Sequence, residues 1–255
     1  MTVKSNGAVY PDIEGKSVIV TGGGSGIGAA IVRAFVRQKA KVGFIDIAEE
    51  PSRALVADLA GQAVHFVPCD LRDIAALRKA IDEIAAVHGP ADILINNAAH
   101  DERHDIATLT PEIFDERIAV NLRHAFFASQ AVLPGMRANG GGSIVNFSSI
   151  SWMAGMGGMA VYTAAKSAML GLTRSLARDF GPDNIRVNAI APGSVRTERQ
   201  LEKWLTPEGD AKRLDAQCLK RWVEPEDIAN FVVFLASDAA SACTAQHYVV
   251  DAGWV

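Results

Sequence analysis

A tyrosine and a lysine four residues apart, Tyr162 and Lys166, stand out among the side chains of this chain that could do chemistry. On a helix this spacing places both on one face, one turn apart. A phenol with a pKa near 10 is a weak base at neutral pH, but a nearby ammonium group stabilises the phenolate and lowers that pKa. Ser149 precedes Tyr162 and carries a hydroxyl that can hydrogen-bond a substrate oxygen. The three side chains together predict acid–base chemistry at an oxygen atom.

A glycine-rich turn near the start of the chain predicts a phosphate site. Residues 17–20 form a β-branched run, and Gly22, Gly26 and Gly28 follow it before a helix-like segment. This order lets backbone N–H groups and a helix dipole meet a pyrophosphate, and a Cβ in the turn would hold the phosphates away. About 20 residues later, Asp46 is placed to accept hydrogen bonds from an adenosine ribose. Because its charge would repel a 2′-phosphate, we expect NAD rather than NADP.

Strand-like and helix-like runs alternate along the whole chain and must position these groups. The strand-like runs are 17–20, 42–45, 64–67, 93–95, 143–147, 185–190 and 247–250, with amphipathic segments such as 74–88 and 164–179 between them. The alternation predicts an α/β fold, a doubly wound parallel seven-stranded sheet of the Rossmann type, in a single domain over residues 1–255. Carboxyl ends of parallel strands share one edge, where ligands bind. Residues expected at that edge are Gly22, Asp46, Asp70, Asn97, Ser149 and Gly193.

Composition excludes several classes of function. The net charge of −4 offers no basic surface for nucleic acid or an anionic membrane. Residues 1–12 lack an apolar core of signal-peptide length, and no stretch reaches the roughly 18 apolar residues of a membrane span. The three cysteines are far apart, so no disulfide framework is implied. We therefore expect a cytoplasmic protein with a small-molecule substrate and no nucleic-acid or membrane partner.

A metal site is not expected. His100 and His104 lie close together with Asp101 and Asp105, but no independent third ligand is near them in the sequence. A solvated or substrate-facing loop is the simpler interpretation of this segment.

These motifs together resemble the short-chain dehydrogenase/reductase family, over residues 10–255. The family's catalytic four match Asn121, Ser149, Tyr162 and Lys166. The resemblance implies that Tyr162 is the acid–base group, that Lys166 binds ribose and tunes Tyr162, that Ser149 positions substrate and that Asn121 supports a proton-relay water. From the residues alone, Ser149 could instead cap a strand end, and Asn121 could simply mark a helix kink.

The resemblance also implies a nicotinamide cofactor, NAD, and a homotetramer. The family's glycine motif, adenine-side acid, Asn-Asn-Ala strand end and Pro-Gly turn all have matches, while Ala99 and Ala252 replace glycines of the pattern. The expected cofactor-binding residues are Gly22, Ser25, Gly26, Ile27, Gly28, Asp46, Ile47, Asp70, Leu71, Asn97, Tyr162, Lys166, Pro192, Gly193, Val195 and Thr197.

Several segments are similar to bacterial sugar 1-dehydrogenases of this family, which act on D-xylose, L-arabinose or D-galactose. They are 101–104, 121–124, 149–152, 204–209, 216–220 and 251–254. This similarity implies NAD-dependent oxidation of an aldose at C1 to the aldonolactone. A pyranose needs bidentate polar partners for its hydroxyls and an aromatic plate for its C–H face, and His100, Asp101, Arg103 and Trp152 could supply these. The expected substrate-binding residues are His100, Arg103, Ser149, Trp152 and Tyr162.

Two other functions stay open. The loop 153–159 is apolar and suits a hydrophobic alcohol equally well, which favours a reductase or dehydrogenase of another alcohol or ketone, such as a 3-oxoacyl thioester. A regulator that senses NAD without turnover is the non-enzymatic alternative. Such a regulator is expected to lack Tyr162 or Lys166, and this chain has both.

Residues 196–223 are too long for a plain loop and predict a helical lid over the substrate. The alternative is ordinary packing of the two tryptophans of this segment, Trp204 and Trp222. His124, beside Arg123, is expected on a helix surface or at an interface.

Overall fold

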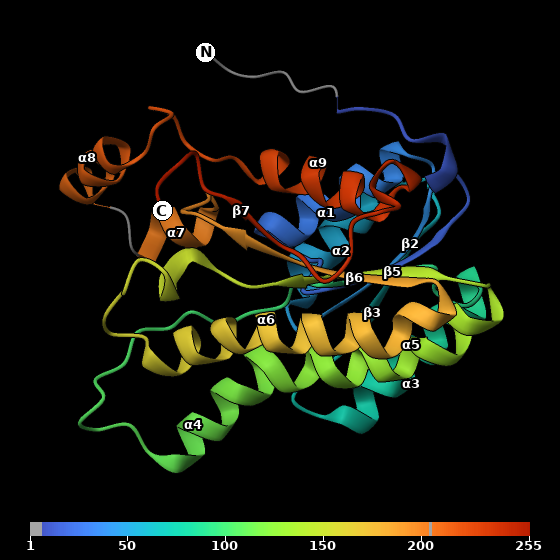
Figure 1. The fold of residues 1–255 in the computed structure, drawn as a ribbon, viewed down its shortest axis with the longest axis horizontal. Helices are drawn as coiled ribbons and strands as arrows, with labels where there is room; N and C mark the ends of the chain where they lie inside the picture. Colours follow the sequence, from blue (N-terminus) through green and yellow to red (C-terminus); the bar gives the residue numbers. More distant parts are fainter. Residues whose placement is uncertain (1–6, 204–205) are drawn as a thin grey trace.

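A seven-stranded parallel sheet forms the centre of the protein (Figure 1). The computed structural model describes residues 7–203 and 206–255. The strands are β1 (Ser17–Thr21), β2 (Lys41–Asp46), β3 (Val64–Pro68), β4 (Ile93–Asn96), β5 (Gly142–Phe147), β6 (Ile185–Pro192) and β7 (His247–Val250). Their spatial order is β3-β2-β1-β4-β5-β6-β7, and the order reverses beside β1. The predicted single-domain, doubly wound fold is confirmed, and each predicted strand is present.

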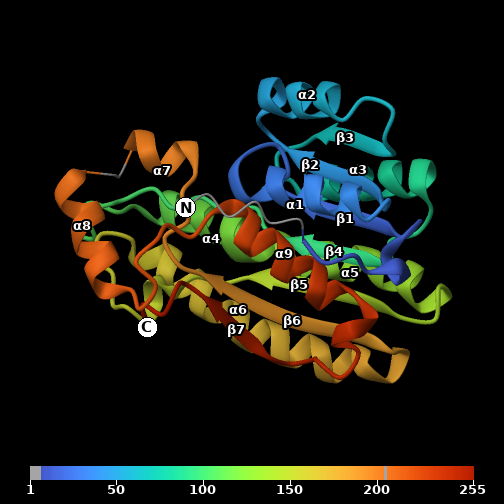
Figure 2. The ribbon, with the colours of Figure 1, turned by 90° about the horizontal axis from the view of Figure 1, so that it is seen from above.

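Helices cover both faces of the sheet (Figures 1 and 2). One face carries α1 (Gly26–Arg37), α2 (Glu49–Asp58) and α9 (Pro225–Ala236). The other carries α3 (Ile74–His88), α5 (His124–Ala138) and α6 (Ala160–Phe180). Because the central strands are buried on both sides, they are built from consecutive apolar residues rather than alternating ones; all of β1 and β4 is buried.

Short helices gather near the carboxyl ends of the strands. α4 (Pro111–Ile118) runs into a π-helical turn (Ala119–Arg123) that continues as α5. α7 (Glu198–Lys203) and α8 (Pro207–Ala216) stand together beyond the sheet, apart from the two main helical layers (Figure 2). Single 3₁₀ turns span Pro11–Ile13, Ile150–Trp152, Gly181–Asp183 and Asp238–Ala240.

Side-chain caps fix where the helices begin. The carboxylate of Asp73 accepts hydrogen bonds from the backbone N–H groups of Ala75 and Ala76, and so starts α3. Thr110 and Thr206 cap α4 and α8 in the same way. In the described part of the chain, every helix is too short or too polar to cross a membrane.

Candidate active site

A cleft of about 1010 Å³ follows the carboxyl ends of the strands. Every residue expected at this edge, from Gly22 after β1 to Gly193 after β6, lies on its wall. All residues that the sequence predicts to bind the cofactor line the same cleft. The topology therefore brings the two groups of sequence-predicted residues together, and their contacts with a ligand stay a prediction.

The glycine turn has the shape of a phosphate cradle. Gly22 and Gly26 have φ values of 67° and 52°, a region that favours glycine. A Cβ on Gly28 would lie 1.8 Å from the carbonyl oxygen of Gly22, so no side chain fits there. Asn97 braces the turn from β4, since its amide donates to the carbonyl oxygens of Thr21 and Gly22 at 3.1 and 2.8 Å. The start of α1 is thereby left open to an anion.

Asp46 lies beside this turn at the end of β2. Its two carboxylate oxygens accept hydrogen bonds from the backbone N–H groups of Gly24, at 2.8 Å, and Ala48, at 2.9 Å. A Cβ on Gly24 would meet Ser52 Oγ at 2.2 Å. The carboxylate is thus held in one place on the cleft wall, as an adenosine-ribose acceptor requires.

Ser149, Tyr162 and Lys166 meet in the middle of the cleft. Ser149 follows β5 and is hydrogen-bonded to the Tyr162 hydroxyl. Lys166 is buried on the same face of α6, with its Nζ 5.8 Å from the centre of the Tyr162 ring and donating to the carbonyl oxygen of Phe147 at 2.8 Å. The proximity that the spacing of four predicts is present.

The lowered pKa of Tyr162 that the sequence predicts is not found in the structure. Burial raises the pKa of Tyr162 to about 12, and the hydrogen bond with Ser149 only partly offsets this. Burial also lowers the pKa of Lys166 to about 7, which weakens its hold on a proton at neutral pH. Burial is the largest cause of both pKa shifts in the protein alone, so proximity by itself does not activate the phenol.

Asn121 lies in the π-helical turn behind the cleft and is fully buried. Its Oδ1 accepts from the backbone N–H of His100 at 2.9 Å, and its Nδ2 donates to the carbonyl oxygens of His100 and Arg117, each at 3.0 Å. Asn121 is not among the cleft-lining residues. It marks a helix irregularity and anchors the loop after β4.

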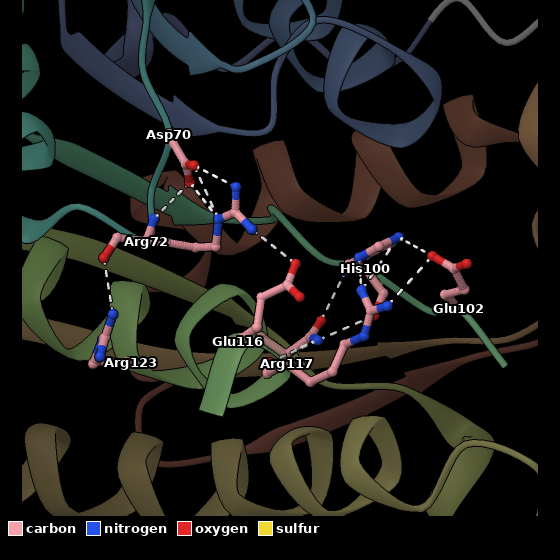
Figure 3. A network of polar contacts seen from close by, with 8 residues as sticks. Asp70, Arg72, His100, Glu102, Glu116, Arg117 and Arg123 are labelled. Carbon is pink, nitrogen blue, oxygen red and sulfur yellow. Dashed lines mark hydrogen bonds and ion pairs between the residues drawn. The ribbon is translucent and has the colours of Figure 1, made fainter. Parts of the chain in front are cut away.

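A charged network joins Asp70, Arg72 and Glu116 (Figure 3). Arg72 donates to both carboxylate oxygens of Asp70, from Nε to Oδ1 at 3.0 Å and from a terminal nitrogen to Oδ2 at 2.6 Å. Its other terminal nitrogen donates to Glu116 of α4 at 2.8 Å. Hydrogen bonding by Arg72 lowers the pKa of Asp70. Arg72 and Glu116 also line the cleft, and the sequence reasoning missed both.

A second network holds His100 between Arg117 and Glu102 (Figure 3). Arg117 donates to Nδ1 of His100, and Nε2 of the same ring lies 3.0 Å from a carboxylate oxygen of Glu102. Arginine has only donors, so the ring is neutral and its Nε2 carries the proton. Burial first, and then the charge of Arg117, lower the pKa of His100. His100 lines the cleft, but both of its ring nitrogens have protein partners.

Of the two other residues predicted to bind substrate, Arg103 and Trp152, only one lines the cleft. Arg103 lines the cleft and donates to the carbonyl oxygen of Gly157 at 3.2 Å. Trp152 does not line it. The 3₁₀ turn after Ser149 directs Trp152 to a smaller pocket of about 340 Å³ behind the cleft, where its indole N–H donates to Ser148. The expected aromatic plate is therefore not provided by this residue.

A different tryptophan, Trp254, lines the cleft. Asp251 positions it, because its carboxylate accepts the backbone N–H groups of Gly253, Trp254 and Val255 at 2.8–3.0 Å. Ala252 has φ 62°, the left-handed conformation that the family's glycine would take more easily. The position of a tryptophan next to this turn was a usable signal, since it ends one of the sugar-dehydrogenase-like segments.

Residues 196–223 form two helices, α7 and α8, that contribute to the cleft wall. Arg213 of α8 is buried, and its guanidinium lies 3.2 Å from the centre of the Trp222 ring. Trp222 is therefore packed within this segment. Trp204 lies outside the described residues.

His124 is fully buried, which overturns its expected place on a surface. Its Nε2 lies 3.5 Å from Oγ1 of Thr21, the hydroxyl that also accepts the backbone N–H groups of Asn97 and Ala98. Burial lowers the pKa of His124 to about 3.

Comparison with known proteins agrees with this geometry. A family model described as "Enoyl-(Acyl carrier protein) reductase" matches residues 22–255. The chain belongs to the short-chain dehydrogenase/reductase family. It is 51% identical over 249 residues to a D-xylose 1-dehydrogenase of Caulobacter vibrioides, covering 97% of this chain and 98% of that protein. It is 52% identical to a "Probable galactose dehydrogenase GalD" of Rhizobium meliloti, covering 96% of each.

A solved structure of a 7α-hydroxysteroid dehydrogenase in complex with NADH and a 7-oxo bile acid is also similar. Its TM-score is 0.91 at 33% identity, and the match covers 96% of each chain. As a member of this family, the protein is a dehydrogenase/reductase whose fold binds a nicotinamide dinucleotide.

Proposed function

We propose that the protein oxidises C1 of an aldose to the aldonolactone with NAD. The observation that carries the proposal is the meeting of Ser149, Tyr162 and Lys166 in the cleft that begins at the glycine turn. The two sugar-dehydrogenase relatives, each more than half identical over nearly the whole chain, support the substrate class.

The residues of the cleft fit a nicotinamide dinucleotide. The glycine turn leaves no room for a Cβ at Gly28, and it opens the start of α1 to a pyrophosphate. Asp46 would accept the ribose hydroxyls, which favours NAD, while Asp70, Ile47 and Leu71 would surround the adenine. When bound, the oxidised nicotinamide accepts the hydride from C1 and brings a positive charge that lowers the pKa of a nearby phenol.

Each catalytic side chain has a defined task in this proposal. Tyr162 takes the proton of the C1 hydroxyl, and Ser149 holds the same oxygen through its hydroxyl group. Lys166 binds the ribose and adds positive charge beside Tyr162. Asn121 acts by fixing the backbone of His100 rather than by touching the substrate.

His100 and Arg103 lie where the remaining hydroxyls of the sugar would reach. Residues 196–223 serve as the lid in this proposal, because α7 and α8 supply residues to the cleft wall. Met156 and Met159 also line the cleft, and they favour the alternative of a hydrophobic alcohol or ketone substrate. We also infer a cytoplasmic homotetramer from the family resemblance, which light scattering on the purified protein tests.

A spectrophotometric screen for NADH formation tests the proposal. The panel contains pentoses, hexoses, aliphatic and steroid alcohols, and the reverse assay uses a 3-oxoacyl thioester. We expect turnover of a pentose or a galactose-like hexose, with a lactone product that hydrolyses to the aldonic acid. Turnover of a steroid or aliphatic alcohol without any aldose would contradict the proposal, and NAD binding without turnover of any substrate would favour a regulator.

A further inference from the structure

Asp101 is an acidic side chain at the substrate end of the cleft that the reaction just described does not use. It follows β4, between His100 and Arg103, and its carboxylate is 21% exposed on the cleft wall. Its negative charge raises the pKa of both Tyr162 and Lys166. The carboxylate therefore lies within electrostatic reach of the reacting centre.

Two side chains of helix α7 hold this carboxylate. Nε of Arg199 donates to Oδ1 at 3.1 Å, and Nε2 of Gln200 donates to Oδ2 at 2.9 Å. A carboxylate has about four lone-pair sites, two on each oxygen. Among the described residues, these two contacts leave one acceptor site on each oxygen.

His100 has no comparable free hydrogen-bonding site for the substrate. Its ring nitrogens are engaged by Arg117 and Glu102, so it reaches substrate only by giving up one of these contacts. Asp101 keeps a free acceptor on each oxygen without losing its support. Two parallel acceptors on one carboxylate match two neighbouring hydroxyl groups, as found on a sugar, and a simple alcohol offers only one hydroxyl.

We propose that Asp101 is the specificity-determining residue for the sugar, accepting hydrogen bonds from two adjacent hydroxyl groups of the substrate while Arg199 and Gln200 hold it in place. This inference rests on the proposed function. It links recognition to α7, because the same carboxylate contacts the helix and the substrate. A substrate that lacks one of the two hydroxyls covers the carboxylate without pairing one of its acceptors and is therefore discriminated against.

The test compares Asp101→Asn with the unmutated protein on the aldose that is turned over best and on each of its monodeoxy analogues. Hydrogen bonds to a charged group predict a loss of about 10- to 100-fold in kcat/KM on the parent sugar. The KM for NAD stays unchanged. With the unmutated protein, kcat/KM on an analogue that lacks either recognised hydroxyl is lower than on the parent sugar by a similar factor. With the variant, removing that hydroxyl lowers kcat/KM little further. For analogues deoxygenated at another carbon, kcat/KM falls relative to the parent sugar by the same factor with both proteins.

Asp105→Asn is the matched control, since Asp105 belongs to the same loop but caps the N–H of Ala107 and does not line the cleft. It leaves the selectivity unchanged. Thermal unfolding checks that each variant is folded. The second variant is Asp101→Glu, which keeps the charge but shifts the carboxylate by one methylene, and we expect the same loss of kcat/KM on the parent sugar. The proposal is overturned if, for every analogue, the loss of kcat/KM from Asp101→Asn adds to the loss from the missing hydroxyl. It is also overturned if kcat/KM of the Asp101→Asn protein on the parent sugar is within threefold of that of the unmutated protein. Absence of aldose turnover in the unmutated protein instead refutes the proposed function itself.

Discussion

Replacing Asp46 by asparagine isolates the charge that we expect to select NAD. The substitution keeps the shape of the side chain and removes one negative charge beside the glycine turn. A 2′-phosphate carries a charge of about −1.5 to −2 at neutral pH. Two unit charges 4 Å apart near a protein surface repel by about 4 kcal/mol, and solvent in the cleft screens a half-exposed pair to about half of that. A phosphate charge of −1.5 to −2 raises this repulsion to about 3–4 kcal/mol. The expected preference for NAD over NADP is therefore roughly 100- to 1,000-fold, since each 1.4 kcal/mol is a factor of ten.

The asparagine variant should lose most of this preference. Its efficiency with NAD falls by about tenfold, because one ribose contact becomes a neutral hydrogen bond, and its efficiency with NADP rises. Stability should fall as well. The amide NH₂ would face the backbone N–H of either Gly24 or Ala48, and an N–H that loses its acceptor costs about 1–3 kcal/mol.

The assay is kcat/KM for each cofactor at saturating sugar, together with thermal unfolding. Asp58→Asn is a suitable control, since Asp58 of α2 forms an exposed ion pair with Arg33 of α1 and the substitution should affect neither quantity by much. Comparable efficiency of the unmutated protein with NAD and NADP would refute the reasoning. So would an Asp46→Asn protein with an unchanged preference.

Other changes test other parts of the structure. Tyr162→Phe should lower turnover at least 100-fold with NAD binding retained in a fluorescence titration, and a variant with more than about a tenth of normal turnover would exclude the acid–base role. Lys166→Ala should weaken both turnover and NAD binding, and unchanged NAD binding would contradict its ribose contact. Gly28→Ala would force a Cβ against the carbonyl oxygen of Gly22, so we expect about 1–3 kcal/mol lower stability in urea unfolding and loss of NAD binding. Burial lowers the pKa of His124 from 6.5 to about 3, so the unfolded chain binds a proton that the folded protein excludes between these pH values. Stability is lost as pH falls through this window, by up to about 1.4 kcal/mol per pH unit, and urea unfolding of His124→Gln should show a shallower dependence; an unchanged slope would exclude His124 as its source.

The fold and the cofactor half of the cleft were predictable because their signals are local. β-Branched runs define the strands, glycines define the turn after β1, and the polar residue after each strand is brought to one edge by the parallel topology. Each of these features depends on a few neighbouring residues, which a sequence displays directly.

The substrate half depends on contacts between distant segments. Trp152 was expected in the substrate site because segment 149–152 is similar to sugar dehydrogenases and a sugar needs an aromatic plate, yet the residue ends a 3₁₀ turn and lines the smaller pocket. Trp254 reaches the cleft through three hydrogen bonds to Asp251, which no periodicity reveals. Burial sets the direction of the Tyr162 pKa shift. The spacing of residues shows which groups are neighbours, but it does not show how much of their hydration they lose in the folded protein.

The pairing of β1 with β4 also has a consequence for how the enzyme is assembled during folding. Thr21 lies opposite Asn96 in the sheet, so this pair forms only after the whole β2–α2–β3–α3 segment has been accommodated. Pairings of such long sequence separation slow folding, because loop-closure entropy must be overcome before the contact stabilises the chain. The glycine turn belongs to the first half of the chain, whereas Ser149, Tyr162 and Lys166 belong to the second. Active protein should therefore appear late in refolding, after most of the helical signal has returned, and no fragment that ends before β5 can contain the complete site.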